Sequence, residues 1–145
     1  KVVGSTMNNF GYLIMIVGKK LRYQLNIALE KEGVTSSQWA VIAQINLSDK
    51  RLTASDIADI VGMDRATVSG IVKRLEAKQL IATQPSSEDR RARVLTLTTD
   101  GEKIFKHCER IANVQMSEFV GPLNPEEQET LFHLLLKLEE GHKVG

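Results

Sequence analysis

Two short amphipathic patterns lie back to back in the middle of the chain, and they restrict its fold more than any other feature. The first, Ala54 to Val61, follows Thr53, whose hydroxyl can cap a helix in a capping box with Asp56. The second runs from Arg65 to Lys78, with apolar residues at steps of three and four. The predicted inward residues are Ile57, Ala58, Ile60 and Val61, then Val68, Ile71, Val72 and Leu75. Two such helices joined by a turn with Gly62 match a helix-turn-helix.

The apolar period changes from helical to alternating after Leu80. The stretches "LIATQ" and "ARVLTLT" are typical of two short antiparallel strands, and the polar residues 85–89 lie between them. Thr98 ends the second strand and can cap the next helix. A hairpin directly after a helix-turn-helix predicts a winged helix.

Long amphipathic helices are expected on both sides of this block. One covers residues 8–32, and two more cover about 100–120 and 124–140. Within the middle block, Thr35 and Gln38 form a further capping-box pattern before an apolar run. The flanking helices have no obvious partner in the middle block, so we expect them to pair in a symmetric dimer.

Composition limits the function classes that fit this chain. The 145 residues suit one domain, and the single cysteine, Cys108, excludes an intramolecular disulfide and suits a reducing compartment. No apolar run reaches the roughly 20 residues of a membrane span, and no secretory signal pattern occurs. We find no phosphate-binding loop, nucleophile elbow or paired catalytic carboxylates, so we expect no enzyme and no cofactor.

The net charge of +1 hides an uneven distribution. Residues 64–93 hold seven basic and four acidic side chains, whereas residues 124–140 hold one basic and five acidic ones. Local positive charge on the second helix and the hairpin favours contact with DNA phosphates. An arginine at a wing tip can reach the minor groove, and Asp89 would then orient a neighbouring arginine by a charge-assisted hydrogen bond.

Less specific interpretations of these residues stay open. The arginine run could be a solvated loop, and Trp39 could be a core residue or line a ligand pocket. Cys108 could sense oxidants, which gives a redox-responsive regulator as an alternative function. The three histidines lack a tight ligand spacing, so we expect no metal site. A winged helix that binds an acidic protein partner is the other alternative.

The segments "LTASDIADIVGMDRATVSGIVKRLEAKQLI" and "SSEDRRARVLTLTTDGE" together resemble the MarR (multiple-antibiotic-resistance regulator) family of bacterial transcription factors. The stretch "SSQWAVIAQI" and the helix order at both ends fit as well, so the resemblance covers essentially residues 7–141. The chain departs from the family pattern in two places. Gln79 stands where a helix-terminating glycine is common, and Ala82 and Thr83 stand where the wing often begins with a basic residue.

The resemblance implies a homodimer that binds a pseudo-palindromic operator in double-stranded DNA, commonly as a repressor released by a phenolic or aromatic ligand. It places Asp89 and Arg91 as the wing pair, with Arg91 in the minor groove. The implied recognition-helix contacts are Arg65, Thr67, Ser69, Lys73 and Arg74, and the implied wing contacts are Asp89, Arg90, Arg91 and Arg93. The candidate effector residues are Tyr12, Arg22, Tyr23 and Trp39.

We therefore expect a mainly α protein with a small β-hairpin wing, located in the bacterial cytoplasm and associated with the nucleoid when it is bound to DNA. Residues 35–98 are expected to form the winged helix-turn-helix. Residues 7–34 and 99–145 are expected to supply the dimerisation helices. Residues 1–6 are expected to be a remnant added to the natural sequence.

Overall fold

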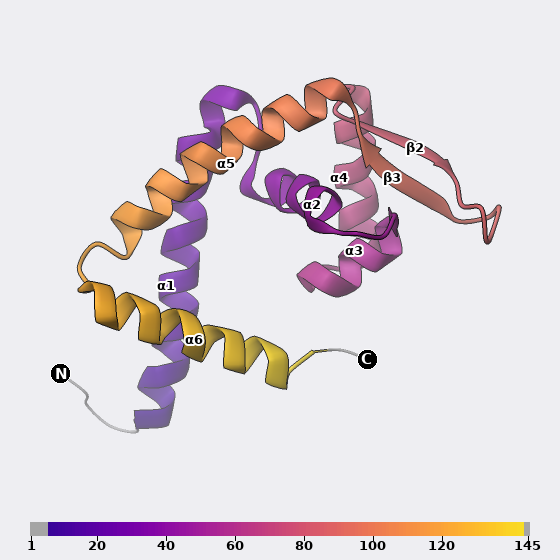
Figure 1. Cartoon of the computed structure of the whole chain (residues 1–145). Helices are drawn as coiled ribbons and strands as arrows, with labels where there is room; N and C mark the ends of the chain where they lie inside the picture. The colour runs from indigo at the N-terminus through magenta and orange to yellow at the C-terminus, as the bar shows by residue number, and fades with distance from the viewer. Residues whose placement is uncertain (1–5, 144–145) are drawn as a thin grey trace.

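The computed structural model describes residues 6–143 and has the expected mainly helical fold with a small β part (Figure 1). Its elements are α1 (Thr6–Leu29), a 3-10 turn η1 (Glu30–Glu32), α2 (Ser36–Leu47), β1 (Leu52–Thr53), α3 (Ala54–Val61), α4 (Arg65–Ala77), β2 (Ile81–Pro85), β3 (Arg93–Leu97), α5 (Thr99–Phe119) and α6 (Pro125–Gly141). Apart from Thr6, the expected remnant lies outside the described residues, as do residues 144–145 of the C-terminal segment. No helix in the described range is long and apolar enough to cross a membrane.

Side-chain caps fix where the helices begin, as the sequence predicts. The hydroxyls of Thr35 and Thr53 accept the backbone N–H groups of Gln38 and Asp56 at 3.0 and 3.1 Å, within complete capping boxes. Helix α6 begins the same way at Asn124, with proline in its first turn. These bonds satisfy N–H groups that a helix start otherwise leaves without partners.

The wing is a hairpin of β2 and β3, and β1 adds a third antiparallel strand in the order β1-β3-β2. Ile81 pairs with Leu97 at the base of the hairpin, and Pro85 pairs with Arg93 near its tip. The pairing of Leu52 with Leu95 was not predicted. A strand of two residues is too short to show an alternating period, so only its β3 partner defines it.

One continuous core joins α2, α3, α4, the sheet and the first half of α5. The predicted stripe of α4 is buried, with Val68 and Leu75 fully enclosed. The prediction for Ile60 was wrong, because 53% of its surface is exposed. Ile57, Ala58 and Val61 share the inward side of α3, while Ile60 falls off that side of the short helix.

The outer helices leave long apolar surfaces uncovered in the single chain. Figure 1 shows α1 and α5 leading away from the winged helix, with α6 as the last helix. The C-terminal part of α1 packs against α5 and α2 around Leu29, Val34 and Cys108. In contrast, no residue of α6 is buried. The exposed apolar residues of α1 and α6 are Phe10, Tyr12, Leu13, Ile14, Met15, Val17, Tyr23, Ile27, Leu131, Phe132, Leu134, Leu135, Leu136 and Leu138.

The junction between α4, the wing and α5 depends on two unusual backbone positions. Gln79 has φ 60°, the left-handed conformation that glycine usually takes after a helix. The N–H groups of Gln79 and Leu80 bond to the carbonyls of Glu76 and Leu75 at 2.9 and 3.0 Å, which completes a Schellman motif. Gly101 lies against the carbonyl of Leu80, because a Cβ there would be 1.9 Å from that oxygen.

Candidate nucleic-acid interface

The start of α4 is held by its N-cap residue, Asp64. The Asp64 carboxylate accepts both the backbone N–H and the hydroxyl of Thr67, each at 2.8 Å. These two bonds, the backbone one first, lower the pKa of the Asp64 carboxyl below its ordinary value. The carboxylate therefore stays ionised beside the helix N-terminus, where negative charge is favourable. The Thr67 hydroxyl already donates its proton to Asp64, so toward a partner at the helix surface it can act only as a hydrogen-bond acceptor.

The exposed side of α4 has three parts with different chemistry. At 100° per residue, Ala66, Gly70 and Lys73 lie near the middle of the exposed arc, opposite the buried stripe. No atom lies within 4 Å of a Cβ built on Gly70. The middle of the helix therefore presents backbone and one lysine, which permits close approach of a large partner. The sequence prediction included Lys73 but omitted both small residues, because it was based on hydrogen-bonding side chains.

Thr67 and Arg74 lie on one shoulder of this arc, beside a groove of about 620 Å³. The groove separates α4 from the segment that joins α1 to α2. Its opposite wall includes Asn26, Glu30 and Thr35. Arg65 and Ser69 lie on the other shoulder and are exposed. All five predicted recognition residues therefore reach the surface of one helix, but two of them also face the groove.

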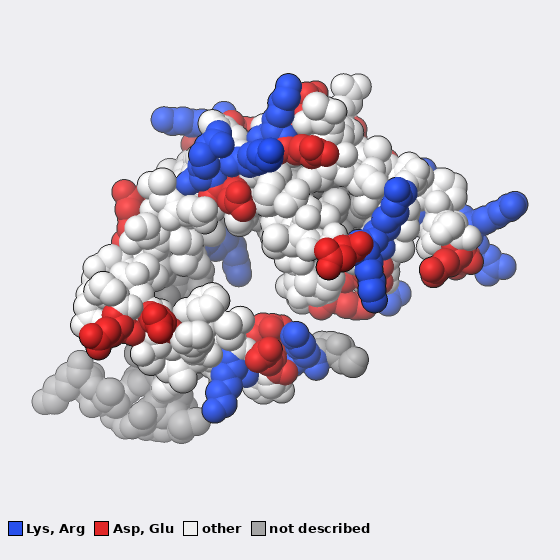
Figure 2. Space-filling view, in the orientation of Figure 1, with Lys and Arg blue, Asp and Glu red and all other residues white. Residues whose placement is uncertain are grey.

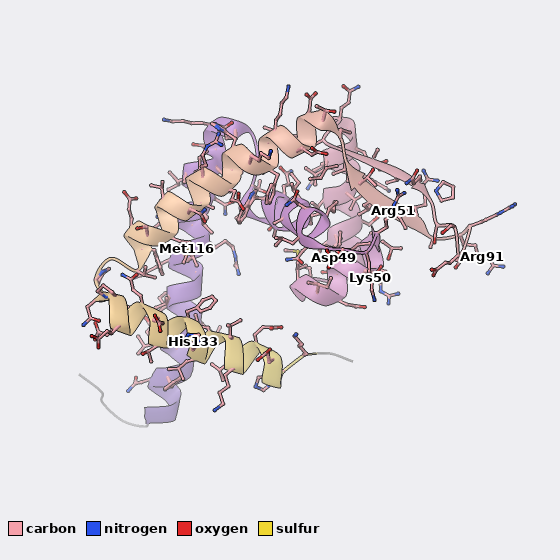
Figure 3. The ribbon with its side chains drawn as sticks, in the orientation of Figure 1. Asp49, Lys50, Arg51, Arg91, Met116 and His133 are labelled. Atoms are coloured by element: carbon pink, nitrogen blue, oxygen red, sulfur yellow. The ribbon has the colours of Figure 1, made fainter. Side chains whose placement is uncertain are left out.

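The wing carries its exposed arginines at the outer end. Figure 2 shows basic side chains extending from that end beside acidic ones, and Figure 3 shows Arg91 there. Arg90 and Arg91 are both exposed. The Asp89 carboxylate accepts the backbone N–H of Arg91 at 3.0 Å.

The hydrogen bond predicted between Asp89 and a neighbouring arginine is present, and its donor is the main-chain N–H of Arg91 rather than a guanidinium. A carboxylate two residues before an N–H closes a local turn, which this short loop favours. Asp89 thus shapes the loop that carries Arg91, and the Arg91 guanidinium remains available to a partner.

Arg93 points back along the wing. Its guanidinium donates to the Thr83 hydroxyl at 2.8 and 3.2 Å and to the Thr83 carbonyl at 3.3 Å. The same hydroxyl bonds to the Glu76 carboxylate on α4 at 3.1 Å. Thr83, one of the two residues at the start of the wing where the sequence resemblance leads us to expect a basic residue, therefore links the wing to α4. Arg93 was predicted as a wing contact, and these bonds support a structural role for it within the wing.

The four candidate effector residues do not form one cavity in the single chain. Tyr12 and Arg22 line the same shallow surface of α1 but are ten residues apart, about 15 Å along the helix axis. Tyr23 is 67% exposed. Trp39 packs between the two core clusters, and its buried Nε1–H has no hydrogen-bond partner.

Cys108 is fully buried between α1 and α5. Burial, with a smaller contribution from the charge of Glu32, raises the pKa of the Cys108 thiol to about 11. A protonated, enclosed thiol is a poor nucleophile. The neighbouring His107 points elsewhere and pairs with Glu32 at 3.1 Å. Among the described residues, no group of three or more His, Cys, Asp or Glu side chains could hold a metal.

Two exposed basic residues that sequence reasoning did not single out, Lys50 and Arg51, lie in the turn between α2 and β1 (Figure 3). They line a hollow together with Leu95 of β3 and Glu102 of α5. No residue of α4 lines that hollow. Lys50 and Arg51 precede the basic segment 64–93 in the sequence. The pairing of β1 with β3 brings them beside the wing strands.

Comparison with known proteins identifies this arrangement. A family model described as the MarR family matches residues 32–92, which run from the end of η1 to the end of the wing loop. The chain is 27% identical over 140 residues to the HTH-type transcriptional repressor MdtR of Bacillus subtilis, covering 97% of this chain and 90% of that protein. It is 26% identical over 119 residues to the transcriptional activatory protein BadR of Rhodopseudomonas palustris, covering 80% and 68%.

The fold extends this likeness to a complex with DNA. A variant of MarR from E. coli, solved with operator DNA, superimposes with a TM-score of 0.81 at 25% identity, covering 93% of this chain and 99% of that one. The similar proteins are named as regulators of transcription, and the similarity includes the helices outside the winged helix. The chain thus matches the MarR family model over its winged helix, and over most of its length it is similar to winged-helix regulators of transcription.

Proposed function

We propose that the protein is a homodimeric transcriptional regulator that binds a pseudo-palindromic operator in double-stranded DNA. The observation that carries this proposal is the exposed surface of α4, open at Gly70, together with the free arginines of the wing on the same winged helix. A recognition helix enters the major groove, and a wing arginine suits the negative potential of a narrow minor groove. The similar E. coli protein was solved with operator DNA, which supports duplex DNA as the partner of this chain.

The residues divide by the contact that each would make. Arg65, Ser69 and Lys73 would meet bases or phosphates from the middle and one shoulder of α4, and Thr67 and Arg74 from the other. Arg91 would enter the minor groove, and Arg90 would contact a phosphate beside it. Asp89 and Arg93 would hold the shape of the wing, since both are bonded within it.

Dimerisation would cover the apolar surfaces of α1 and α6. Helix α1 carries three basic and no acidic residues, whereas α6 carries five acidic residues and one lysine. Opposite charges beside two exposed apolar stripes favour packing of α1 from one chain against α6 of a second copy. Such a dimer would place two recognition helices about 34 Å apart, in successive major grooves.

We propose further that the regulator is a repressor released by a small aromatic or phenolic acid. MdtR is named a repressor and BadR an activator, so the similar proteins include both repressors and activators of transcription. The groove between α4 and the α1–α2 segment offers Arg74 as a carboxylate partner and Ile71 as an apolar wall. A ligand there would press on the recognition helix directly. Tyr12, Arg22, Tyr23 and Trp39 remain the prediction from sequence, for a pocket that would need the second copy to close around α1.

Selection of duplexes from a random pool tests the DNA assignment. We expect one enriched sequence with two inverted half-sites about ten base pairs apart, because the dimer has twofold symmetry. Affinity for that sequence should fall steeply with salt, with a log–log slope of several units, since each phosphate contact contributes about −0.9. A partner that is an acidic protein predicts no enriched sequence.

The redox alternative is disfavoured by the burial and the raised pKa of Cys108. A regulator of this kind needs no catalytic group, cofactor or membrane partner. Because its target would be chromosomal DNA, we place its action in the bacterial cytoplasm.

A further inference from the structure

Lys78 makes the longest-range polar contact of the recognition helix. It is the C-cap residue of α4, and its side chain turns back to the segment between α1 and α2. The ammonium donates to the carbonyl of Gly33 and, at 3.4 Å, to Oε1 of Gln38. These partners lie 45 and 40 positions earlier in the chain: Gly33 follows the 3-10 turn after α1, and Gln38 is in the first turn of α2.

The two acceptors belong to a joint that is itself fixed. Gly33 closes the 3-10 turn in the left-handed conformation, with its N–H on the carbonyl of Glu30 at 3.0 Å. Gln38 is only 7% exposed, and its Oε1 also accepts the N–H of Thr35 at 3.3 Å within the capping box. Asn26 adds a bond from α1 to the first residue of α2, at 2.7 Å. Lys78 therefore contacts the joint at which α1 is attached to α2.

The last turn of α4 is thus held from two sides. Glu76 bonds to Thr83 of the wing at 3.1 Å, and Lys78 bonds to the α1–α2 joint. Gly33 and Gln38 also line the groove beside Thr67 and Arg74. Lys78 therefore connects the two walls of that groove, where a change in the angle between α1 and α4 would have to occur.

We propose that Lys78 is a positioning residue: it sets the angle between the recognition helix and the dimerisation helix, and so the separation at which the two copies read their half-sites. The inference rests on the proposed binding of DNA by a dimer. A lysine at the end of α4 would otherwise be assigned to a DNA phosphate. Its ammonium instead has two protein acceptors in the free chain, which makes it part of the scaffold that holds the helix.

The test compares Lys78→Met with wild type on the selected operator and on versions with the half-site spacing changed by one base pair in each direction. Wild type should prefer one spacing. For Lys78→Met we expect the ratio of affinities between the preferred and the altered spacings to fall about fivefold or more, as for other residues that couple two parts of a protein. The dependence of affinity on salt should not change. Lys78→Arg should restore the preference, because arginine keeps the charge and the reach to Gly33.

Lys73→Met is the matched control, since Lys73 is an exposed lysine near the middle of the same helix. It should weaken binding at all spacings and reduce the salt slope by about 1, as expected for a phosphate contact. Gln38→Glu is a second variant that keeps Lys78 in place and strengthens its acceptor. It should sharpen the preference for the wild-type spacing.

The opposite pattern would overturn the proposal: Lys78→Met that loses about 1 unit of salt slope and keeps the wild-type spacing preference makes Lys78 a phosphate contact. Failure of the proposed function looks different, because wild type itself would then bind no operator with a salt-dependent affinity. Thermal melting of each variant checks its fold. A folded Lys78→Arg that fails to restore the preference also contradicts the proposal.

Discussion

The winged helix and the outer helices carry the same kind of apolar pattern but differ in what covers it. In α4, the predicted stripe is enclosed, with Val68 and Leu75 at 0% exposure. In α6, the equivalent stripe remains open, and Leu134 and Leu135 are each 54% exposed. A helical period in a sequence therefore predicts that a face will be buried. It does not say whether the same chain supplies the partner.

The charges of the two regions differ in a way that supports different partners. The apolar residues beneath α4 and the wing are already buried within the chain. The positive charge on this surface is therefore available for the proposed contact with DNA. The opposite charges of α1 and α6 stand beside apolar surfaces that are still uncovered. Under the proposed function, the first region would bind DNA, and the second would be covered by a second copy of the chain.

Removal of α6 should have the largest effect. We expect a chain that ends at Val120 to be monomeric or insoluble, because the uncovered stripe of α1 loses its partner. A soluble monomer should bind the full operator about 100-fold or more weakly, since two linked half-site contacts become one. Sedimentation and a mobility-shift assay measure both quantities.

A single substitution in α6 tests the same dimer without removing the helix. Leu135→Glu should dissociate the dimer, whereas His133→Glu, which adds the same charge change on the opposite side of α6, should not. A soluble monomer that binds the full operator as tightly as wild type would refute the dimer.

Gly101→Ala should be the most damaging single change at the junction between α4, the wing and α5. The new Cβ would lie 1.9 Å from the backbone oxygen of Leu80, which also accepts the N–H of Thr98. We expect a loss of about 3 kcal/mol in unfolding free energy, as for severe overpacking. Urea denaturation measures it, and an unchanged midpoint would show that α5 can shift at no cost.

Arg91→Ala should weaken operator binding by more than about 1 kcal/mol while the dimer stays intact, because the side chain is free of protein partners and carries a charge to the minor groove. Arg93→Ala is the comparison, since its guanidinium is bonded to Thr83. It should loosen the wing rather than remove a DNA contact. Equal binding by wild type and Arg91→Ala in a shift assay would exclude the wing assignment.

Gly70→Ala should separate stability from binding. The site has open space for a Cβ, so alanine should raise the unfolding free energy by roughly 0.5–1 kcal/mol through its higher helix propensity. The same methyl group should weaken operator binding, because it would stand where the helix approaches the bases. Improved stability with unchanged affinity would show that DNA does not come close at this position.

Gln79→Gly should give a small gain in stability, about 1 kcal/mol, because glycine takes the φ of 60° without steric cost. A rise in melting temperature with no change in operator affinity is the expected result. A lower melting temperature would mean that the Gln79 side chain contributes contacts that outweigh the strain.

Local signals made much of the fold predictable from sequence. Thr35, Thr53 and Asn124 mark helix starts through bonds to residues three positions away, and a local window contains everything that such a bond needs. Gln79 was singled out differently, because the family that the sequence resembles often has a helix-terminating glycine at that position. These features depend on neighbours in the chain, so a single sequence reveals them.

The features that were missed depend on distant neighbours. Strand β1 exists because Leu52 meets Leu95, and Gly101 matters because Leu80 lies against it. In the sequence, Lys78 is indistinguishable from the other basic residues of the α4 region. Its contact with the carbonyl of Gly33 is visible only in the folded chain. The exposure of Ile60 had a different cause, since a helix as short as α3 defines its inward side poorly.

The mass of the protein bound to a selected operator duplex tests the central claim most directly. Native mass spectrometry of wild type with the full inverted repeat should give two chains per duplex, and Leu135→Glu should give a much weaker complex. One chain bound to the full site with wild-type affinity, or no complex that depends on the duplex sequence, would contradict a dimer that reads DNA through α4 and the wing.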